Sequence, residues 1–198
     1  MGRPTKENSL TPQDVIVAAI ACLDREGESA LGVNRVAREL GIKPPAIYKH
    51  LDGNAALRRA VALAIWQQYA AWCRQRLDGV NAPCVMLKVC GHATRKFAHS
   101  YPARYRVMMR FQMHLSDTEA APLIQETLDF MRRVLQSYEL SEAKLIDSMR
   151  MVNAAINGFI AVEQAGLLTL ERSTDASFEV MLDALIVAIQ HIRDASTE

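Results

Sequence analysis

The sequence predicts an all-helical fold, with a small group of three helices followed by a larger helical bundle. Apolar residues recur at spacings of three and four along most of the chain, which is the period of an amphipathic helix. Prolines stand near the starts of several of these segments and glycines near their ends. No stretch of useful length alternates apolar and polar residues as a half-buried strand does. Half of the 198 residues are hydrophobic, so the chain can bury a sizeable core.

The first helix is predicted to begin after Thr11 and to end at Gly27. Thr11 can cap a helix, Pro12 suits the first helical position, and Asp14 is favoured near the positive end of the helix dipole. An apolar stripe then follows at helical spacing. The stripe consists of Ile16, Ala19, Ile20 and Leu23.

Two short helices joined by a tight turn are predicted next. The first runs from about Val33 to Leu40, where Gly41 stops it, and the second runs from Pro44 to Leu51. Prolines at the first two positions of a helix break no hydrogen bond, because those N–H groups have no partner inside the helix. The residues expected to pack the two helices together are Ala37, Leu40, Ile42 and Ile47. A helix, a glycine turn and a short second helix form the unit that reads DNA in helix-turn-helix proteins.

The rest of the chain is predicted to form a helical bundle. A long helix begins at about Asn54 and carries apolar residues at helical spacing. Further helices are expected at about 82–99, 102–115, 119–138, 142–166 and 175–193. We therefore divide the chain into two domains, an N-terminal arm with the three-helix domain over residues 1–56 and a larger helical domain over residues 57–198.

The formal net charge is only +1, but basic residues gather in one region. Residues 29–60 hold six basic and two acidic side chains, which gives +4 locally. The basic residues are Arg35, Arg38, Lys43, Lys49, Arg58 and Arg59. A basic patch near one end is what neutralisation of DNA phosphates requires, although charge runs also occur on ordinary solvated faces. Arg3 and Lys6 form a short basic arm that can enter a minor groove, the alternative being a solubilising tail.

The sequence predicts a soluble, cytoplasmic protein without a membrane partner. The first ten residues hold no apolar core of a signal peptide. The longest apolar run, residues 15–23, is far shorter than the about 20 residues that a membrane span needs. The four cysteines have no C-x-x-C spacing and are expected to be reduced, mostly buried thiols, with a redox sensor as the alternative. They are Cys22, Cys73, Cys84 and Cys90.

The stretch from Val33 to Leu51, VNRVARELGIKPPAIYKHL, resembles the helix-turn-helix of the tetracycline-repressor (TetR) family. The resemblance covers roughly residues 11–60, and its most specific parts are the Leu-Gly-Ile turn and the Ala-Ile-Tyr-Lys-His stretch. It implies a transcriptional regulator that binds a double-stranded DNA operator as a homodimer. It also implies DNA-binding roles for a set of residues in and beside the second short helix. They are Lys43, Pro44, Pro45, Ala46, Tyr48, Lys49 and His50.

These residues divide into two groups by chemistry. Pro44, Pro45 and Ala46 match positions that meet base edges, and their apolar side chains favour contact with thymine methyl groups. Tyr48 and His50 match positions that donate to phosphates, and Lys43 and Lys49 are expected as further phosphate contacts. The alternative is that Tyr48 packs into a three-helix core and the basic residues only solubilise the domain.

Three positions depart from the family pattern. Gly32 stands where a capping Thr or Ser is common, and glycine is a tolerable cap. Lys43 also replaces a common Ser or Thr, so a cap is lost while a charge is gained. Asn54 replaces a frequent lysine, which removes one usual phosphate contact, and Arg58 or Arg59 could compensate.

The C-terminal part resembles, in three segments, the WHG type of C-terminal domain that some members of the family carry. The segments are Phe97–Met109, Asn157–Glu163 and the helix from Phe178 to Ile189. The tryptophan and histidine that give this type its name appear here as Asn153 and Asn157. The family resemblance implies that residues 57–198 bind a ligand and form the dimer.

The two last long helices are expected to form a four-helix dimer interface. Small residues such as Ala154 and Gly158 would let helices pack closely. The expected interface residues are Leu145, Met149, Val152, Ile156, Phe159, Phe178, Leu182, Leu185 and Ile189. The alternative is that these stripes serve only the core of the single chain. Spacing does not separate the two, and the resemblance favours the dimer.

A pocket for a small, apolar effector needs apolar lining with a few polar groups. The candidate lining residues are Trp66, Tyr69, Met86, Cys90, Phe97, Tyr101, Tyr105, Met108, Met109, Phe111 and Met113. Candidate polar points are His92, His99 and His114. The alternative is that these methionines and aromatic residues form plain core.

The sequence therefore favours a ligand-released repressor acting as a homodimer on a pseudo-palindromic operator. No catalytic or metal-binding motif is present, and neither an enzyme nor a cofactor is expected. Two alternatives stay open. One is a DNA-binding protein without a small ligand, which either is a regulator controlled by a protein partner or acts as an architectural factor. The other is a helical binding protein or enzyme that does not bind DNA.

Overall fold

A computed structural model describes residues 10–195 of the chain, apart from the side chain of Pro83. This part is helical and contains no strand, which confirms the predicted fold class. The long helices are α1 (Pro12–Glu26), α4 (Gly53–Leu77), α5 (Pro83–Ser100), α7 (Ala121–Leu135), α8 (Glu142–Gln164) and α9 (Thr174–Asp194). The shorter ones are α2 (Val33–Glu39), α3 (Pro44–Tyr48), α6 (Pro102–Arg110) and the 3-10 helices η2 (Glu28–Ala30) and η3 (Gln136–Tyr138). Within the described residues, no helix is long and apolar enough to cross a membrane.

The chain forms two compact units. The first contains the residues up to Gln68 together with Tyr101–Met113, and the second contains Tyr69–Ser100 and the residues from His114 onward. Helix α4 therefore contributes its first part to one unit and its last part to the other. The functional boundary predicted between residues 56 and 57 is a different kind of division and stays a prediction.

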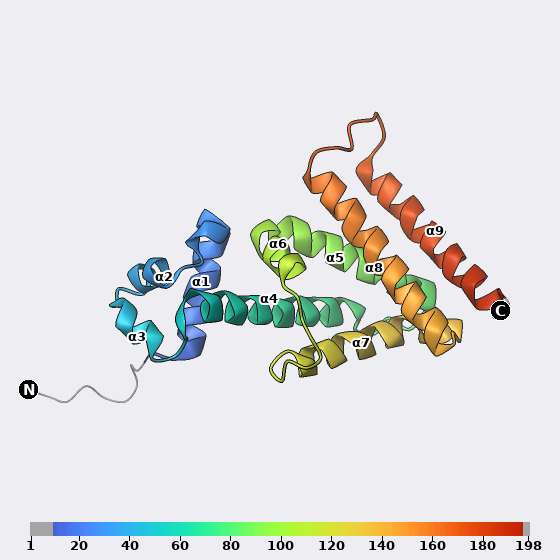
Figure 1. The fold of residues 1–198 in the computed structure, drawn as a ribbon. Helices are drawn as coiled ribbons and strands as arrows, with labels where there is room; N and C mark the ends of the chain where they lie inside the picture. Colours follow the sequence, from blue (N-terminus) through green and yellow to red (C-terminus); the bar gives the residue numbers. More distant parts are fainter. Residues whose placement is uncertain (1–9, 196–198) are drawn as a thin grey trace, which may run out of the picture. The chain divides into compact units, whose positions relative to one another are not determined.

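In the first unit, α1 packs against α2 and α6, and α2 packs against α3 (Figure 1). The start of α1 follows the local signals in the sequence. The Thr11 side chain accepts a hydrogen bond from the Asp14 N–H at 3.1 Å, and the Asp14 carboxylate accepts one from the Thr11 N–H at 2.9 Å. This capping box satisfies two N–H groups that have no partner inside the helix. Gly27 ends α1 with a left-handed φ of 82°.

Helix α6 belongs to the first unit and is shorter than predicted. It ends at Arg110, whereas the sequence suggested residue 115. The last buried residue of α6 is Met108, and Leu115 is 66% exposed. No buried apolar stripe therefore supports a longer helix. Arg104 fastens α6 to α1 and α4 through Asp24 Oδ1 and Gln68 Oε1, both 2.9 Å from its guanidinium.

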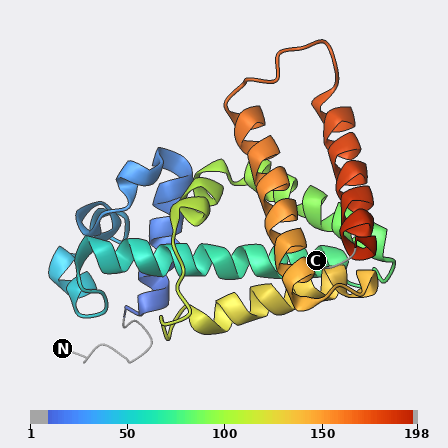
Figure 2. The ribbon, with the colours of Figure 1, turned by 45° about the vertical axis from the view of Figure 1, so that its right-hand side comes forward.

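In the second unit, α8 and α9 lie side by side as an antiparallel pair, and α5 packs against both (Figures 1 and 2). The core includes Phe97 of α5, Ile160 of α8 and Phe178 of α9, each at most 1% exposed. Gly91 of α5 lies directly against Leu182 of α9. A Cβ atom at this position would lie 2.7 Å from Cδ2 of Leu182. Glycine at position 91 therefore lets the two helices pack closely.

Replacing Gly91 tests this close approach. Gly91→Val is expected to lower the free energy of unfolding by about 1–3 kcal/mol, because an added side chain collides with Leu182 in a packed core. Urea denaturation measures the change. Lys96→Val, at an exposed position of the same helix, controls for placing a β-branched residue in α5. Equal effects of the two substitutions would contradict the tight packing at Gly91.

Candidate nucleic-acid interface

The turn between α2 and α3 has a defined hydrogen-bonded geometry. The Ile42 N–H donates to the Ala37 carbonyl at 3.0 Å, and the Gly41 N–H donates to the Arg38 carbonyl at 3.2 Å. Gly41 has φ 65°, a left-handed conformation that favours glycine. These bonds satisfy carbonyls at the end of α2 and set the direction in which the chain enters α3.

Helix α3 is held by one buried side chain. Ile47 has no exposed surface and packs with the buried side of α2, which includes Val36 and Ala37. The N-terminus of α3 needs little capping, because Pro44 and Pro45 carry no N–H. Lys43 makes no side-chain cap, as its replacement of Ser or Thr predicted. The first available donor, the Ala46 N–H, bonds the Lys43 carbonyl at 2.9 Å.

The predicted DNA-binding residues lie together around α3. Tyr48 is 54% exposed, so the alternative in which it packs into the core is wrong. Lys43, Pro45, Lys49 and His50 are also exposed, and Pro44 and Ala46 are half-buried. The helix ends at Tyr48 rather than Leu51, which leaves Lys49 and His50 in the turn that follows. The contacts of these residues with DNA stay a prediction, and Arg3 and Lys6 lie outside the described residues.

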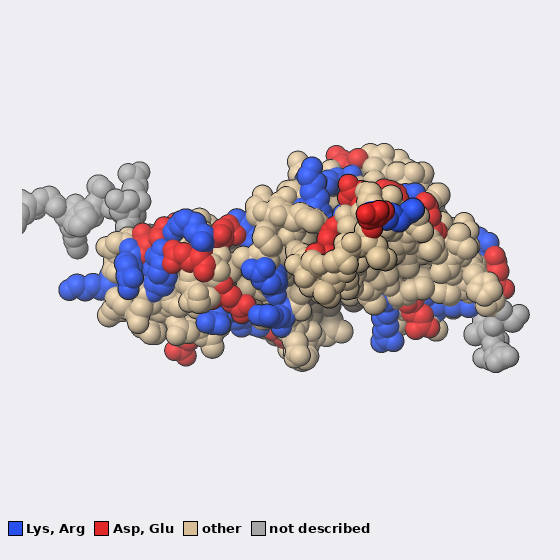
Figure 3. Space-filling view, turned by 90° about the horizontal axis from the view of Figure 1, so that it is seen from above, with Lys and Arg blue, Asp and Glu red and all other residues tan. Residues whose placement is uncertain are grey.

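Only part of the basic cluster is available to phosphates. Arg35 is paired with Glu26 and Glu39, and Arg25 bonds Glu39 at 2.7 Å. The hydrogen bonds from Arg35 hold the pKa of both carboxyl groups below their ordinary value. Figure 3 accordingly shows basic and acidic side chains close together over the first unit. Among the described residues, Lys43 and Lys49 have no ion-pair partner.

The first turns of α4 hold the start of α2. Oδ1 of Asn54 accepts a hydrogen bond from the Val33 N–H at 2.8 Å, and Nε of Arg58 donates to the Leu31 carbonyl at 3.1 Å. Arg59 has a different environment, with its guanidinium 5.9 Å from the ring centre of Phe111. Sequence reasoning treated Asn54 only as a lost phosphate contact. The capping group lies 21 residues from the helix that it caps, so local sequence carried no signal for it.

The predicted pocket residues are divided between the two units. Trp66 and the residues from Tyr101 to Met113 belong to the first unit, where Tyr105 and Met108 are buried and Met109 is 43% exposed. Tyr69, Met86, Cys90 and Phe97 belong to the second unit. A pocket lined by these residues stays a prediction.

In the second unit, three aromatic side chains pack beside a hydrogen-bonded pair of hydroxyl groups, those of Tyr69 and Thr94. The Tyr69 ring packs edge-on against Phe97 with centres 5.3 Å apart, and Trp72 donates from Nε1 to the Ala93 carbonyl at 2.9 Å. The Thr94 hydroxyl donates to the Cys90 carbonyl at 2.9 Å. The Thr94 hydroxyl has one proton, which this bond uses. The Tyr69 hydroxyl is therefore the donor to Thr94 Oγ1, at 2.8 Å. Burial raises the pKa of Tyr69, which keeps the phenol protonated as this donor role requires.

The cysteines are free thiols, and three of the four are buried, as predicted. Burial raises the pKa of Cys73 to about 11 and that of Cys90 to about 12. Both thiols are therefore protonated near neutral pH, which makes them poor nucleophiles. The exposed thiol is Cys84.

None of the predicted pocket residues lines either of two hollows on the described surface of the second unit. One, of about 340 Å³, lies beside Arg74, Leu77, Phe130 and Arg133. The other, of about 380 Å³, is shared by the end of α7, η3 and the start of α8. Both are lined largely by charged and polar side chains, which does not match the lining expected for an apolar effector.

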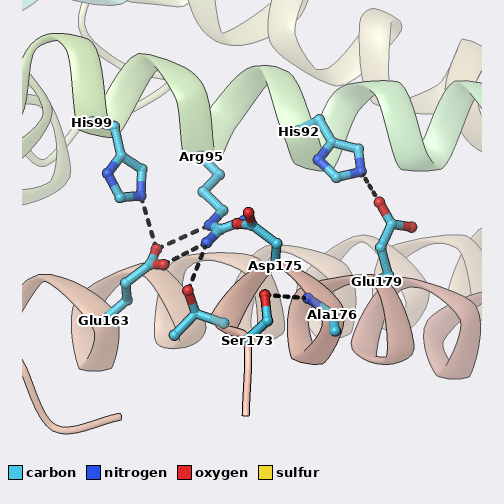
Figure 4. A network of polar contacts seen from close by, with 9 residues as sticks. His92, Arg95, His99, Glu163, Ser173, Asp175, Ala176 and Glu179 are labelled. Atoms are coloured by element: carbon cyan, nitrogen blue, oxygen red, sulfur yellow. Dashed lines mark hydrogen bonds and ion pairs between the residues drawn. The ribbon is translucent and has the colours of Figure 1, made fainter. Parts of the chain in front are cut away.

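Two of the histidines expected as polar points hold α5 to α8 and α9 (Figure 4). Nε2 of His99 lies 2.9 Å from Glu163, and Nε2 of His92 lies 2.6 Å from Glu179. Between them, Nε of Arg95 donates to Glu163 at 3.0 Å. Figure 4 shows the three α5 side chains pointing toward the carboxylates of the other helices. These polar groups are therefore engaged in helix packing.

The Arg95 pair is the least exposed ion pair of this network. The side chains of Arg95 and Glu163 are each 11% exposed, and the Arg95 guanidinium lies 4.9 Å from the ring centre of Phe178. Hydrogen bonds from Arg95, with a smaller contribution from His99, lower the pKa of Glu163 to about 2. In the residues described, no three His, Cys, Asp or Glu side chains gather where a metal ion could be held.

The structure places most of the predicted dimer-interface side chains in the core of the single chain. Val152 and Ile156 of α8 are at most 4% exposed. Their counterparts on α9, Phe178, Leu182, Leu185 and Ile189, are at most 6% exposed. Leu145, Met149 and Phe159 are half-buried. The larger apolar residues are used within the chain, so any partner would meet other faces of these helices.

Comparison with known proteins relates the chain to a family of transcriptional regulators. The family model for the tetracyclin repressor-like C-terminal domain matches residues 87–185, which is half of the chain. The uncharacterized HTH-type transcriptional regulator Rv0681 of Mycobacterium tuberculosis is 28% identical over 190 residues, which cover 96% of this chain and 85% of that protein. The tetracycline repressor protein class A from transposon 1721 of Escherichia coli is 29% identical over 157 residues, which cover 79% of this chain and 68% of that protein.

Solved structures share the same fold. A TetR variant from Acinetobacter baumannii AYE in complex with minocycline superposes with a TM-score of 0.72 at 23% identity, covering 94% of this chain and 99% of that one. A protein of unknown function from Rhodococcus sp. RHA1 has a TM-score of 0.78 at 14% identity, covering 94% and 98%.

A helix-turn-helix unit in an all-helical chain, together with these relatives, defines a transcriptional regulator of the helix-turn-helix class. The chain belongs to the tetracycline-repressor family. The narrower resemblance to the WHG type of C-terminal domain stays a prediction.

The depressed pKa of Glu163 predicts a specific dependence of stability on pH. Its pairing with Arg95 stabilises the fold fully above the ordinary carboxyl value of 4.5, and this contribution is lost as the pH falls toward 2. Glu163→Gln should lower the free energy of unfolding at pH 7 by about 1–3 kcal/mol, because it leaves Arg95 without its main partner. Urea denaturation at neutral pH and near pH 3 should show the difference from wild type shrinking in acid.

Asp175→Asn provides the control for this experiment. Asp175 also pairs with Arg95, but its side chain is 84% exposed, so its replacement should change stability little. If Glu163→Gln and wild type lost stability in parallel between pH 4.5 and 2, the assignment of this acid-sensitive contribution to Glu163 would be wrong.

Proposed function

We propose that the protein is a sequence-specific DNA-binding repressor that acts as a homodimer on a pseudo-palindromic operator and is released by a small, apolar effector. The observation that carries the DNA-binding part is the exposure of Tyr48, Lys49 and Lys43 around a helix anchored by the buried Ile47. Such a regulator, acting on chromosomal DNA, would work in the cytoplasm.

DNA recognition is proposed to combine apolar base contacts with phosphate contacts. Pro44, Pro45 and Ala46 at the start of α3 would meet base edges, with thymine methyl groups as the favoured partners. Tyr48 and His50 would donate to phosphates, and Lys43 and Lys49, which have no ion-pair partner among the described residues, would add charge. Phosphate contacts would set the register and base contacts the sequence preference.

The homodimer is proposed to form through the outward faces of α8 and α9. Exposed apolar residues recur at spacings of three and four from Ala154 to Ala161 on α8 and from Val180 to Val187 on α9, which places them on the outward side of each helix, and Ile146 and Val162 flank this side on α8. These residues are Ile146, Ala154, Gly158, Ala161 and Val162 on α8 and Val180, Ala184 and Val187 on α9. Two such helices from each subunit would form a four-helix interface. This keeps the predicted helices and changes the side chains that are assigned to the interface.

The effector is proposed to act within the larger helical part of the chain. Support comes from the second unit, where the buried Cys90 and Phe97 contact Thr94 and Tyr69, and the buried Met86 lies one helical turn before Cys90. Apolar surroundings with a few polar groups are typical of a small-molecule site. A TetR protein of similar fold has been solved with minocycline. If the effector favours a subunit arrangement with the wrong spacing of α3, effector and DNA weaken each other's binding by the same factor.

Selection of bound fragments from sheared genomic DNA at near-physiological salt, followed by sequencing, tests the proposed function. Enrichment of an inverted repeat is expected, with half-sites about one helical turn apart. Weak binding that vanishes as salt rises, without enrichment, would reject specific DNA reading. Operator binding that no small molecule weakens would favour control by a protein partner.

Tyr48 offers a direct test of the proposed phosphate contact. Tyr48→Phe should weaken operator binding by about tenfold, because a hydrogen bond to a charged group is lost. Thermal unfolding should be unchanged, since the ring is largely exposed. Fluorescence anisotropy with a labelled operator measures the affinity. An affinity equal to that of wild type would remove Tyr48 from the interface.

The outward face of α9 offers a test of the homodimer. Val187 is 63% exposed, and Val187→Asp should convert the dimer to a monomer at micromolar concentration, because a charge would be buried at the interface. Val17→Asp is the matched control, since Val17 is 57% exposed on α1. Sedimentation velocity distinguishes the two states. A dimeric Val187→Asp protein would exclude this face.

A further inference from the structure

The start of α2 is capped from a different helix. The N-cap position of α2 is Gly32, which has no side chain to accept a hydrogen bond. The first N–H groups of a helix nevertheless need acceptors. Oδ1 of Asn54, in the first turn of α4, accepts from the Val33 N–H at 2.8 Å. The cap of α2 is therefore a contact between two helices.

A second side chain of α4 holds the same segment. Arg58 lies four residues after Asn54, so the two side chains stand on one face of α4. Its Nε donates to the Leu31 carbonyl at 3.1 Å. Together the two contacts hold the segment Leu31–Val33 by one acceptor and one donor from α4. The backbone of Leu31 and Val33 thus depends on the position of α4 for both bonds.

We propose that Asn54 is a positioning residue for DNA recognition, which fastens the start of α2 to α4 and thereby sets the angle of α3. Helix α2 passes its position to α3 through the Ile42–Ala37 hydrogen bond and the buried Ile47. A shift of the first turn of α2 relative to α4 moves the recognition helix with it. This inference rests on the proposed function, since it assigns a role in operator binding.

The structure allows the capping role to be separated from the fastening role. A Cβ atom added at Gly32 would meet only Asn54 Oδ1, at an ordinary contact distance of 3.8 Å, and Gly32 has an extended backbone that any residue adopts. A serine at position 32 can therefore cap α2 from within its own chain segment. Such a cap supplies an acceptor to the first turn of α2, at the N–H of Asn34 or Arg35, without tying α2 to α4.

The experiment compares wild type, Asn54→Ala, Gly32→Ser and the double variant. Asn54→Ala should lower the thermal midpoint by about 2–4 °C, as the loss of one cap does in a chain of this size. It should also weaken operator binding by about fivefold to tenfold at a temperature where the protein is folded. The slope of affinity against salt should not change, because no phosphate contact is removed.

The double variant decides between the two roles. Adding Gly32→Ser to Asn54→Ala should restore the thermal midpoint but leave operator affinity reduced, and Gly32→Ser alone should bind as wild type does. Full recovery of affinity in the double variant would mean that Asn54 is only a cap and would overturn the proposal. Wild-type affinity of Asn54→Ala would also overturn it. A salt slope reduced by about one would identify a direct phosphate contact instead.

Hydrogen exchange of the α2 amides separates failure of this inference from failure of the proposed function. Asn54→Ala should raise exchange at the Val33 amide whether or not DNA is bound. If wild type enriches no operator but Asn54→Ala still loses this protection, the proposed function fails while the fastening of α2 to α4 stands. Unchanged protection at Val33 would overturn the fastening itself.

Discussion

The recognition helix has five residues, too few to be stable alone, so its position depends on the burial of Ile47. This side chain has no exposed surface, and the left-handed turn at Gly41 sets the angle at which the chain reaches it. Every side chain on the solvent side of α3, Tyr48 included, takes its orientation from this one anchor. Two bonds from α4 hold the start of α2, the helix against which α3 packs, so the support that α4 gives to the recognition helix passes through α2.

Helix α5 plays a comparable central role in the second unit, because its two sides have different partners. One side presents Phe97 and Thr94 to Tyr69 and to the ring of Trp72. The other side presents Arg95, whose charge is paired with Glu163. These residues lie within a single turn of one helix, so a ligand that displaced α5 on its aromatic side would also disturb the ion pair with α8. The helices proposed for the dimer are thus mechanically linked to the region proposed for the effector.

The sequence predicted what local signals determine. The capping residues Thr11 and Asp14 marked the start of α1, and the glycine turn marked the boundary of α2. The end of α6 was misplaced because residues such as Phe111 and Met113 continue the apolar composition without continuing a buried stripe. The fastening by Asn54 and the Arg95–Glu163 pair were not foreseen, since their partners lie 21 and 68 residues away. Contacts of that kind are decided by packing, which helical spacing does not encode.

The faces proposed for the dimer show most clearly why an apolar stripe is ambiguous. Helix α8 is apolar on two sides, and a period of 3.6 residues fits a stripe turned toward the core as well as one turned toward a partner. The core takes most of the large residues, such as Ile156 and Ile160, and leaves mainly alanine, glycine and valine outside, together with Ile146. An interface built from small residues relies on close approach of backbones rather than on large buried anchors. Each contact then contributes little, so a small rotation of the α8–α9 pair would change many contacts at once, which suits the proposed dimer, whose arrangement the proposed effector would have to shift.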